Sequence, residues 1–324
     1  MSYNEQMHFL IKHVKEMREE LGRNPSMAEF KAKFPRINIK ILFHSFEAFL
    51  KAAGLVEPES EEIKTISSPP KILVFDIETK PMKVWSWGIW EQNIGLDMII
   101  EDWSVLCWAA KWIGNDQIFY QDLSQNTDYT KDELIVRGIW ELLNECSVVV
   151  TQNGIRFDVK KLNAKFEEYG LGSPSPYKHI DALRIVKKHF ALTSNKLEFS
   201  THKFNEKYKK LSHGKFAGMK LWIECLKGNQ EAWAEMKLYN IHDVLALEEL
   251  YLNNLRKWDN TINFGVYTAT GNTCPNCGSS DLEKKEFSYT KTGAFQVYQC
   301  NSCKSFCQSR HNELSRSVTK GLLK

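Results

Sequence analysis

The chain has 324 residues, 43% of them apolar and 26% charged, which is typical of a soluble globular protein with one large domain and smaller attachments. It contains no apolar run of about 18 residues, and its charged N-terminus lacks the apolar core of a secretion signal, so we expect a cytoplasmic protein without a membrane span. The net charge of +3 is unevenly divided, because residues 1–56 and 255–324 are basic and the residues between them acidic. An acidic core can bind cations, and basic terminal segments can bind phosphates. On charge alone, however, ordinary solvated surface side chains are the simpler explanation.

Residues 1–56 are predicted to form a small helical domain. Apolar residues with helical spacing run through residues 4–21, and the stretch GRNP ends that helix. Ser26 and Glu29 have the spacing of a capping box at the start of a second helix, and a third helix ends at Gly54. Basic residues accompany these helices, namely Arg23, Lys31, Lys33, Arg36 and Lys40. A nucleic-acid-binding unit and an oligomerisation or packing domain fit this pattern equally, and GRNPSMAEFKAKFP…SFEAFLKAAGL resembles the helical repeats attached to some homing and phage nucleases.

Residues 71–256 are predicted to form the core domain, after a polar, proline-containing linker at residues 57–70. The apolar strand ILVF is followed by strand patterns at 103–112 and 117–123, which predict an antiparallel meander. From residue 130 helical patterns alternate with strand patterns at 147–152 and 178–181. We therefore expect an α/β fold with a mixed sheet and helices on its faces.

Four acidic residues lie at the ends of buried strands of this core or shortly after them. Strand periodicity places Asp76 and Glu78 on one face, where neighbouring carboxylates repel each other unless a cation or a proton intervenes. Oxygen ligands favour a hard divalent cation. Asp158 lies in the first turn of the helix after the Asn153–Gly154 turn, a position that the helix dipole alone explains but that α/β sheets also use for ligands. Asp181 also follows a strand, and its simplest role is to cap the next helix.

A fifth acid, Asp243, lies in the helix predicted over residues 229–255. The buried face of this helix is defined by Trp233, Met236, Ala246, Leu247 and Leu250. Tyr239 precedes Asp243 by four residues and lies on the same side one turn away, whereas His242 is rotated by about 100°. A carboxylate within an apolar stripe is costly unless it is paired or bound to a metal. The pattern therefore predicts a site at Asp243 with Tyr239, not His242, as its partner.

The stretches FDIET, NGIRFD and YNIHD, in this order, resemble the three motifs of the DEDD exonuclease superfamily, whose members have an RNase H-like (DnaQ-like) fold. Tyrosine four residues before the last aspartate is typical of the DEDDy branch, which includes proofreading domains of family A and B DNA polymerases. The histidine branch has His five residues before it, where this chain has Leu238. The resemblance covers residues 71–254, and what it implies for the site is a set of two Mg²⁺ or Mn²⁺ ions, an attacking water oriented by Tyr239, and four carboxylate ligands. These ligands are Asp76, Glu78, Asp158 and Asp243.

The activity that this resemblance implies is a metal-dependent 3′–5′ exonuclease that releases nucleoside 5′-monophosphates. DIETKPMKVWSWGIWEQNIGL also resembles phage-encoded relatives, so we expect a bacterial or phage-infected host cell. Single-stranded DNA is the expected substrate because Trp85 and Trp87 suit stacking on unpaired bases, although both suit anchoring of their loop equally. Asn153 and Gly154 either admit the terminal nucleotide close to the backbone or form a plain turn. An exoribonuclease, a structure-selective endonuclease and a catalytically idle nucleic-acid-binding adaptor are the alternatives.

The last predicted domain, residues 257–324, is a zinc ribbon with a basic tail. Two CxxC pairs lie 22 residues apart and together supply the four thiolates of one structural zinc ion. The pairs are Cys274 with Cys277 and Cys300 with Cys303. The segment between them alternates as a hairpin does, Cys307 is expected to be a packed thiol, and a redox dithiol is the main alternative.

Overall fold

The computed structural model describes residues 3–35, 37, 39–43, 45–56, 69–209, 214–268 and 271–323. The chain divides into two compact units, Met1–Thr65 and Ile66–Lys324, and each is described by itself. Residues 57–68 of the predicted linker and Arg36 lie outside the described residues, as does the side chain of Lys40. None of the described helices is both long and apolar enough to cross a lipid bilayer.

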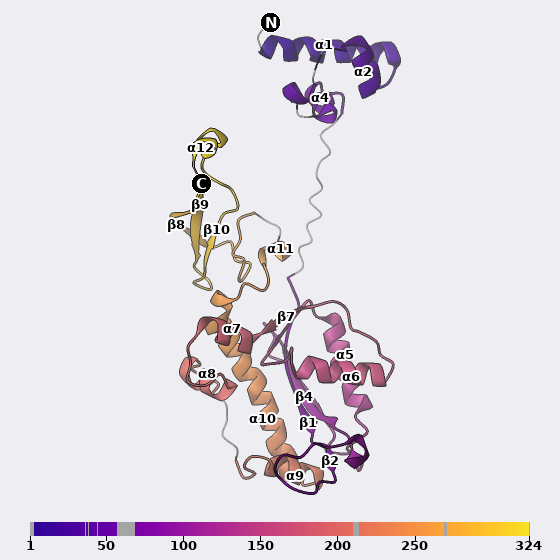
Figure 1. The fold of residues 1–324 in the computed structure, drawn as a ribbon, viewed down its shortest axis with the longest axis vertical. Helices are drawn as coiled ribbons and strands as arrows, with labels where there is room; N and C mark the ends of the chain where they lie inside the picture. Colours follow the sequence, from indigo (N-terminus) through magenta and orange to yellow (C-terminus); the bar gives the residue numbers. More distant parts are fainter. Residues whose placement is uncertain are drawn as a thin grey trace. The chain divides into compact units, whose positions relative to one another are not determined.

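The first unit is helical, as its periodicity predicts (Figure 1). Its helices are α1 (Tyr3–Leu21), α2 (Met27–Lys33), α3 (Ile39–Phe43) and α4 (Phe46–Ala52). The capping box is present, because Ser26 Oγ accepts a hydrogen bond from Glu29 N at 3.2 Å and Glu29 Oε2 accepts one from Ser26 N at 2.7 Å. Phe30 and Phe49 are fully buried and pack edge to face at 5.0 Å. The helix α3 was not predicted, since five residues are too few to show a helical period.

The second unit is built on a five-stranded mixed sheet in the order β5-β4-β1-β6-β7. These strands are β1 (Ile72–Lys80), β4 (Ser104–Trp112), β5 (Ile118–Asp122), β6 (Val148–Thr151) and β7 (Lys178–Asp181). β1, β4 and β5 form the predicted antiparallel meander, while β6 pairs in parallel with both β1 and β7. The predicted α/β fold with a mixed sheet is therefore confirmed.

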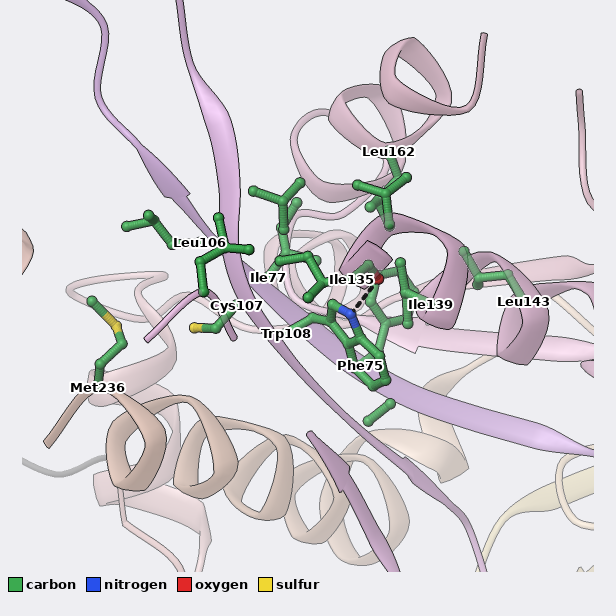
Figure 2. Close-up of a cluster of buried hydrophobic side chains, with 14 of the residues drawn as sticks. Phe75, Ile77, Leu106, Cys107, Trp108, Ile135, Ile139, Leu143, Leu162 and Met236 are labelled. Carbon is green, nitrogen blue, oxygen red and sulfur yellow. Dashed lines mark hydrogen bonds between the residues drawn. The ribbon is translucent and has the colours of Figure 1, made fainter. Parts of the chain in front are cut away.

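Helices cover both faces of this sheet, with α5 (Glu133–Glu145) and α6 (Asp158–Glu168) on one side and α10 (Gln230–Glu249) on the other (Figure 1). Successive side chains of a strand point to opposite faces of the sheet, so alternate residues of each strand pack against opposite helix layers. Figure 2 shows the α5 side, where Phe75 and Trp108 pack among apolar residues of α5. The Trp108 indole donates a hydrogen bond to Ile135 O at 2.7 Å, so its burial leaves no unsatisfied N–H.

Shorter elements complete the unit. Those with only two or three residues were not predicted, because so short a segment cannot show a helix or strand periodicity. The shorter elements are β2 (Lys83–Val84), η1 (Leu96–Met98), β3 (Ile99–Glu101), α7 (Ala182–His189), α8 (Leu197–Phe204), α9 (Lys220–Leu226), η2 (Leu250–Leu255), η3 (Arg256–Trp258) and α11 (Gly265–Thr268). β2 and β3 form a ladder at the base of the loop that carries the exposed tryptophans. This base is held by Lys80, which is 4% exposed and lies 2.8 Å from Glu101 Oε2.

The C-terminal part contains the predicted hairpin, β8 (Leu282–Tyr289) and β9 (Ala294–Cys300), followed by β10 (Phe306–Gln308) and α12 (Arg316–Gly321). The strand order is β10-β9-β8, with every pair antiparallel. A three-stranded sheet beside four clustered cysteines fits the predicted zinc ribbon. The third strand and α12 were not predicted.

Candidate active site

A cavity of about 590 Å³ lies where the end of β1, the start of α6 and the middle of α10 meet. The structure brings all five predicted catalytic side chains to its lining, although they come from three separate elements. These residues are Asp76, Glu78, Asp158, Tyr239 and Asp243. Other lining residues are Gln152, Asn153, Phe157, Leu183, Lys187, Asn195, Lys196, Leu197 and Glu198.

Strand β1 delivers the first two carboxylates. Asp76 pairs with Ala109 and Glu78 with Cys107, so both acids share the sheet face that α10 covers. The register shifts directly after Glu78, because Thr79 pairs with Val105 and leaves an extra residue on β4. A bulge of this kind bends the ladder and re-aims the adjacent side chains. Here it lies at the end of the acidic pair.

Asp158 reaches the same cavity from the first turn of α6 and is only 3% exposed. Its Oδ1 accepts a hydrogen bond from Ile77 N at 3.3 Å, which connects it to the strand between the two other acids. Burial raises the pKa of Asp158 to about 6, against the opposing effect of the backbone hydrogen bonds it accepts. A buried carboxylate that resists ionisation gains most from a nearby cation, because the cation offsets the cost of desolvation.

The middle of α10 supplies Tyr239 and Asp243, one helical turn apart. Asp243 is 5% exposed, and the Tyr239 ring packs edge to face on Trp222 with centroids 6.3 Å apart. His242 does not line the cavity; its ring faces Tyr208, with centroids 5.8 Å apart. Burial lowers the pKa of His242 below its ordinary value. The helix therefore separates the two neighbours of Asp243 as the sequence geometry predicts.

Asn240 is a residue that the sequence reasoning missed. It is fully buried, and its Nδ2 donates to Asp76 Oδ2 at 2.8 Å and to Asp76 O at 3.4 Å. Its Oδ1 faces the Cys107 thiol, which lies 3.9 Å away. The available signal was spacing: Asn240 precedes Asp243 by three residues, which places both on neighbouring positions of one helix face. Asn240 therefore fixes the orientation of the first carboxylate from the helix that carries the last one.

The turn after β6 is organised by Asp181, which caps α7 as predicted by accepting from Leu183 N at 3.0 Å. Its carboxylate also accepts from Asn153 N at 2.9 Å. Asn153 lines the cavity with a left-handed φ of 67°, a conformation that asparagine tolerates better than most residues. A Cβ at Gly154 would lie 2.3 Å from Thr151 Oγ1, so close packing inside the turn requires this glycine.

Two lysines of the lining, Lys187 and Lys196, were also missed; they bring positive charge to a cavity otherwise dominated by acids. By contrast, Trp85 and Trp87 do not line the cavity. They are 72% and 96% exposed, and this exposure contradicts the alternative that they anchor their loop to the core. Their aromatic faces are open to solvent.

The four cysteines of the ribbon form a second candidate metal site. Their sulfur atoms all lie within 4.8 Å of one another, and the Sγ–Sγ distances are 3.6 Å for Cys274–Cys303 and 3.5 Å for Cys277–Cys300. A tetrahedron with Zn–S bonds of about 2.3 Å has sulfur atoms roughly 3.8 Å apart, close to these values. Burial raises the pKa of the Cys274 and Cys277 thiols, whereas hydrogen bonds from the Cys303 backbone and the Cys277 thiol lower the pKa of Cys300 to about 7 despite burial. The number and spacing of the four sulfur atoms fit a structural zinc ion.

Comparisons with known proteins define the class of the core. Residues 105–253 match the family model of the RNase_H superfamily, so this part of the chain is an RNase H-like domain, as the motifs predict. The match supports a nuclease, and with it a nucleic-acid substrate. Residues 7–56 match the model of the homing endonuclease associated repeat.

Among solved structures, the chain is similar to the family B DNA polymerase from the hyperthermophilic archaeon Pyrobaculum calidifontis. The two share 15% sequence identity with a TM-score of 0.41, over 69% of this chain and 31% of that chain. The chain thus spans about a third of the polymerase. No curated protein sequence matches it.

Proposed function

We propose that residues 71–256 form a DEDDy-type 3′–5′ exonuclease that hydrolyses nucleic acid, with single-stranded DNA as the preferred substrate. The observation that carries the proposal is the convergence of four carboxylates and Tyr239 on one cavity of about 590 Å³. Residues 1–56 and 257–324 are assigned as accessory domains, and the zinc ribbon as a structural metal site.

The donor set of the cavity fits Mg²⁺ or Mn²⁺, because four carboxylates offer only hard oxygen ligands. The four carboxylates come from β1, α6 and α10 and together offer enough oxygen atoms to ligate two ions. Two such ions supply an activated water and stabilise the leaving oxygen in phosphodiester hydrolysis.

The remaining side chains of the cavity bind and orient the substrate. Tyrosine has an ordinary pKa near 10, so the Tyr239 hydroxyl is protonated at neutral pH and acts as a hydrogen-bond donor and acceptor, not as a base. It orients the attacking water. Lys187 and Lys196 balance the charge of the terminal phosphates, and Phe157 and Leu197 provide apolar surface for the terminal nucleotide.

The test uses 5′-labelled single-stranded and duplex DNA and RNA, with Mg²⁺ or Mn²⁺ added to buffer free of divalent ions. A ladder that shortens from the 3′ end, lost in Asp76→Ala, supports the proposal. Cuts in a circular single strand would instead favour an endonuclease, and faster trimming of RNA an exoribonuclease. If wild type and Asp76→Ala both bind but neither cleaves, the chain is an adaptor.

The matched pair Tyr239→Phe and His242→Ala tests the geometry of α10. Loss of the Tyr239 hydroxyl is expected to lower kcat about 10²–10³-fold, the usual effect of removing one oriented polar group, with unchanged affinity for Mn²⁺. His242→Ala, outside the cavity lining, should change kcat less than about threefold, well below the effect of a catalytic group. The reverse order of effects in two folded variants would refute the assignment.

A further inference from the structure

We propose that one face of the zinc ribbon is a second nucleic-acid-binding surface, which stacks on the bases of a single strand. This surface, the aromatic face, consists of Lys284, Phe287 and Tyr289 on β8 and Tyr298 on β9. None of its residues lines the carboxylate cavity. The inference concerns binding and does not require that the core cleaves the strand.

Strand register places these side chains together. Lys284 pairs with Tyr298 and Tyr289 with Ala294, and opposed residues of an antiparallel ladder project from the same face. Phe287 follows Lys284 by three residues, which would put it on the opposite face of a regular strand. The register shifts between them, however, so that Phe287 pairs with Gln296 and returns to the face of Tyr298.

A specific hydrogen bond holds this bulge, because Gln296 Nε2 donates to the Lys285 carbonyl at 2.6 Å. The bulge therefore aligns three rings along one side of the hairpin. Tyr289 is 76% exposed and Phe287 is 43% exposed, whereas Tyr298 is half-buried. Rings in a row on an open sheet are the arrangement by which proteins stack on successive unpaired bases, each worth a sizeable gain in affinity without sequence preference.

The aromatic face continues into a cavity of about 280 Å³, which Tyr298 helps to line. Leu282 and Cys307 extend the same sheet face into this cavity, since they follow the register of Lys284 and Tyr298. Arg310 and Asn272 add hydrogen-bond donors to the lining. Its volume lies just below the range for pockets that hold drug-sized ligands, about 300–1,000 Å³. A cavity of this size is better suited to a single nucleotide than to the surface of a folded protein.

Charge also favours a nucleic acid. Residues 255–324 contain ten Lys and Arg and five Asp and Glu, an excess of five positive charges. Four thiolates on one Zn²⁺ subtract two, so the segment stays basic when the metal is bound. On the sheet itself, Lys284 lies on the aromatic face, while on the other face Glu283 pairs with Gln299 and forms an ion pair with Lys285 at 2.7 Å. A polyanion with exposed bases is complementary to this side of the sheet.

The opposite face supplies a matched control. Phe306 pairs with Gln299, lies on the face of Glu283, and is 64% exposed. Binding is measured with the full-length, zinc-loaded chain carrying Asp76→Ala, so that the strand stays intact, by fluorescence anisotropy of a labelled 20-nucleotide single strand. Phe287→Ala and Tyr289→Ala are each expected to raise Kd about 5- to 150-fold, the range for loss of one stacked base. Phe306→Ala should change Kd less than twofold.

Tyr289→Phe tests the chemistry of the contact, because it keeps the ring and removes only the hydroxyl; it should restore nearly the wild-type Kd. Zinc content and circular dichroism show whether each variant is folded. Unchanged Kd in the double variant Phe287→Ala/Tyr289→Ala would overturn the proposal. An equal loss in Phe306→Ala would overturn it as well, since binding would then lack a preferred face. A wild-type chain that cleaves nothing would refute the proposed exonuclease but would not alter these affinities.

Discussion

Replacing Asn240 with leucine removes a polar contact that the proposed metal site depends on. The two side chains have similar volumes, but leucine cannot donate the 2.8 Å hydrogen bond to Asp76 Oδ2. We expect weaker binding of Mn²⁺ or Mg²⁺ and slower cleavage, because Asp76 loses a hydrogen-bond donor that orients its carboxylate. The fold should persist, since Asp76 is only half-buried and cavity water can replace the lost donor.

The magnitude follows from the type of bond. A hydrogen bond to a charged group contributes about 1.5–3 kcal/mol, which corresponds to a change of roughly 10- to 150-fold in an equilibrium constant. Loss of groups that orient metal ligands usually costs about 10–100-fold in metal affinity or activity. We therefore expect the Mn²⁺ Kd of Asn240→Leu to rise about 10–100-fold. Its free energy of unfolding should fall by about 1–3 kcal/mol, the cost of leaving one hydrogen-bond partner unpaired.

The assay is calorimetric titration of Mn²⁺ into wild type and variant, with cleavage rates measured at low and saturating Mn²⁺. Asn205→Leu serves as the matched control, because Asn205 is buried and donates to Ala246 O on the same helix at 2.8 Å without contacting a carboxylate. It should lose stability but keep its affinity for Mn²⁺. If wild type binds Mn²⁺ and Asn240→Leu binds it within twofold, the orienting role of Asn240 is refuted.

Three further predictions concern stability and the zinc site. Burial lowers the pKa of His179 from 6.5 to about 4. The contribution of neutral His179 to the free energy of unfolding is therefore complete above pH 6.5 and falls by up to about 3 kcal/mol as the pH drops to 4. His179→Gln should lose this part of the pH dependence in urea titrations. Lys111→Met removes the partner of Glu248, whose Oε1 lies 2.6 Å from the Lys111 Nζ, and leaves a mostly buried charge unpaired. The free energy of unfolding measured in urea should fall by about 3–5 kcal/mol, and adding Glu248→Leu should restore most of this loss. Cys277→Ser should abolish the one bound zinc in mass spectrometry and expose residues 271–308 to proteases, whereas normal zinc content would disprove the four-thiolate site.

Long periodic segments made much of this fold predictable. The apolar spacing of α10 placed Trp233 and Met236 inside, and both are buried. Consecutive strand-like apolar segments predicted the meander, and the CxxC pairs marked the cysteine cluster. Such patterns can be recognised because the buried face of a long helix or strand requires apolar residues at regular spacing along the sequence.

Features that depend on contacts between residues far apart in the sequence could not be predicted from local patterns. Asn240 looks like any polar helix residue until the fold brings it to Asp76, 164 positions earlier in the chain. Lys187 and Lys196 gain significance only from the acidic cavity that they join. The strands β2, β3 and β10 have two or three residues each, so their pairing, not their sequence, creates them. The exposure of Trp85 and Trp87 likewise required the structure to exclude an anchoring role.

The distribution of the carboxylates over β1, α6 and α10 has a consequence during synthesis. Asp243 leaves the ribosome 167 residues after Asp76, a delay of about 10–30 s at translation rates of roughly 5–20 residues per second. Until then a nascent chain holds an incomplete ligand set and lacks the helix that covers one face of its sheet. Because α10 supplies both the cover and the last carboxylate, a chain that has not finished folding cannot assemble the full site. The arrangement couples the onset of the proposed activity to the completion of the domain.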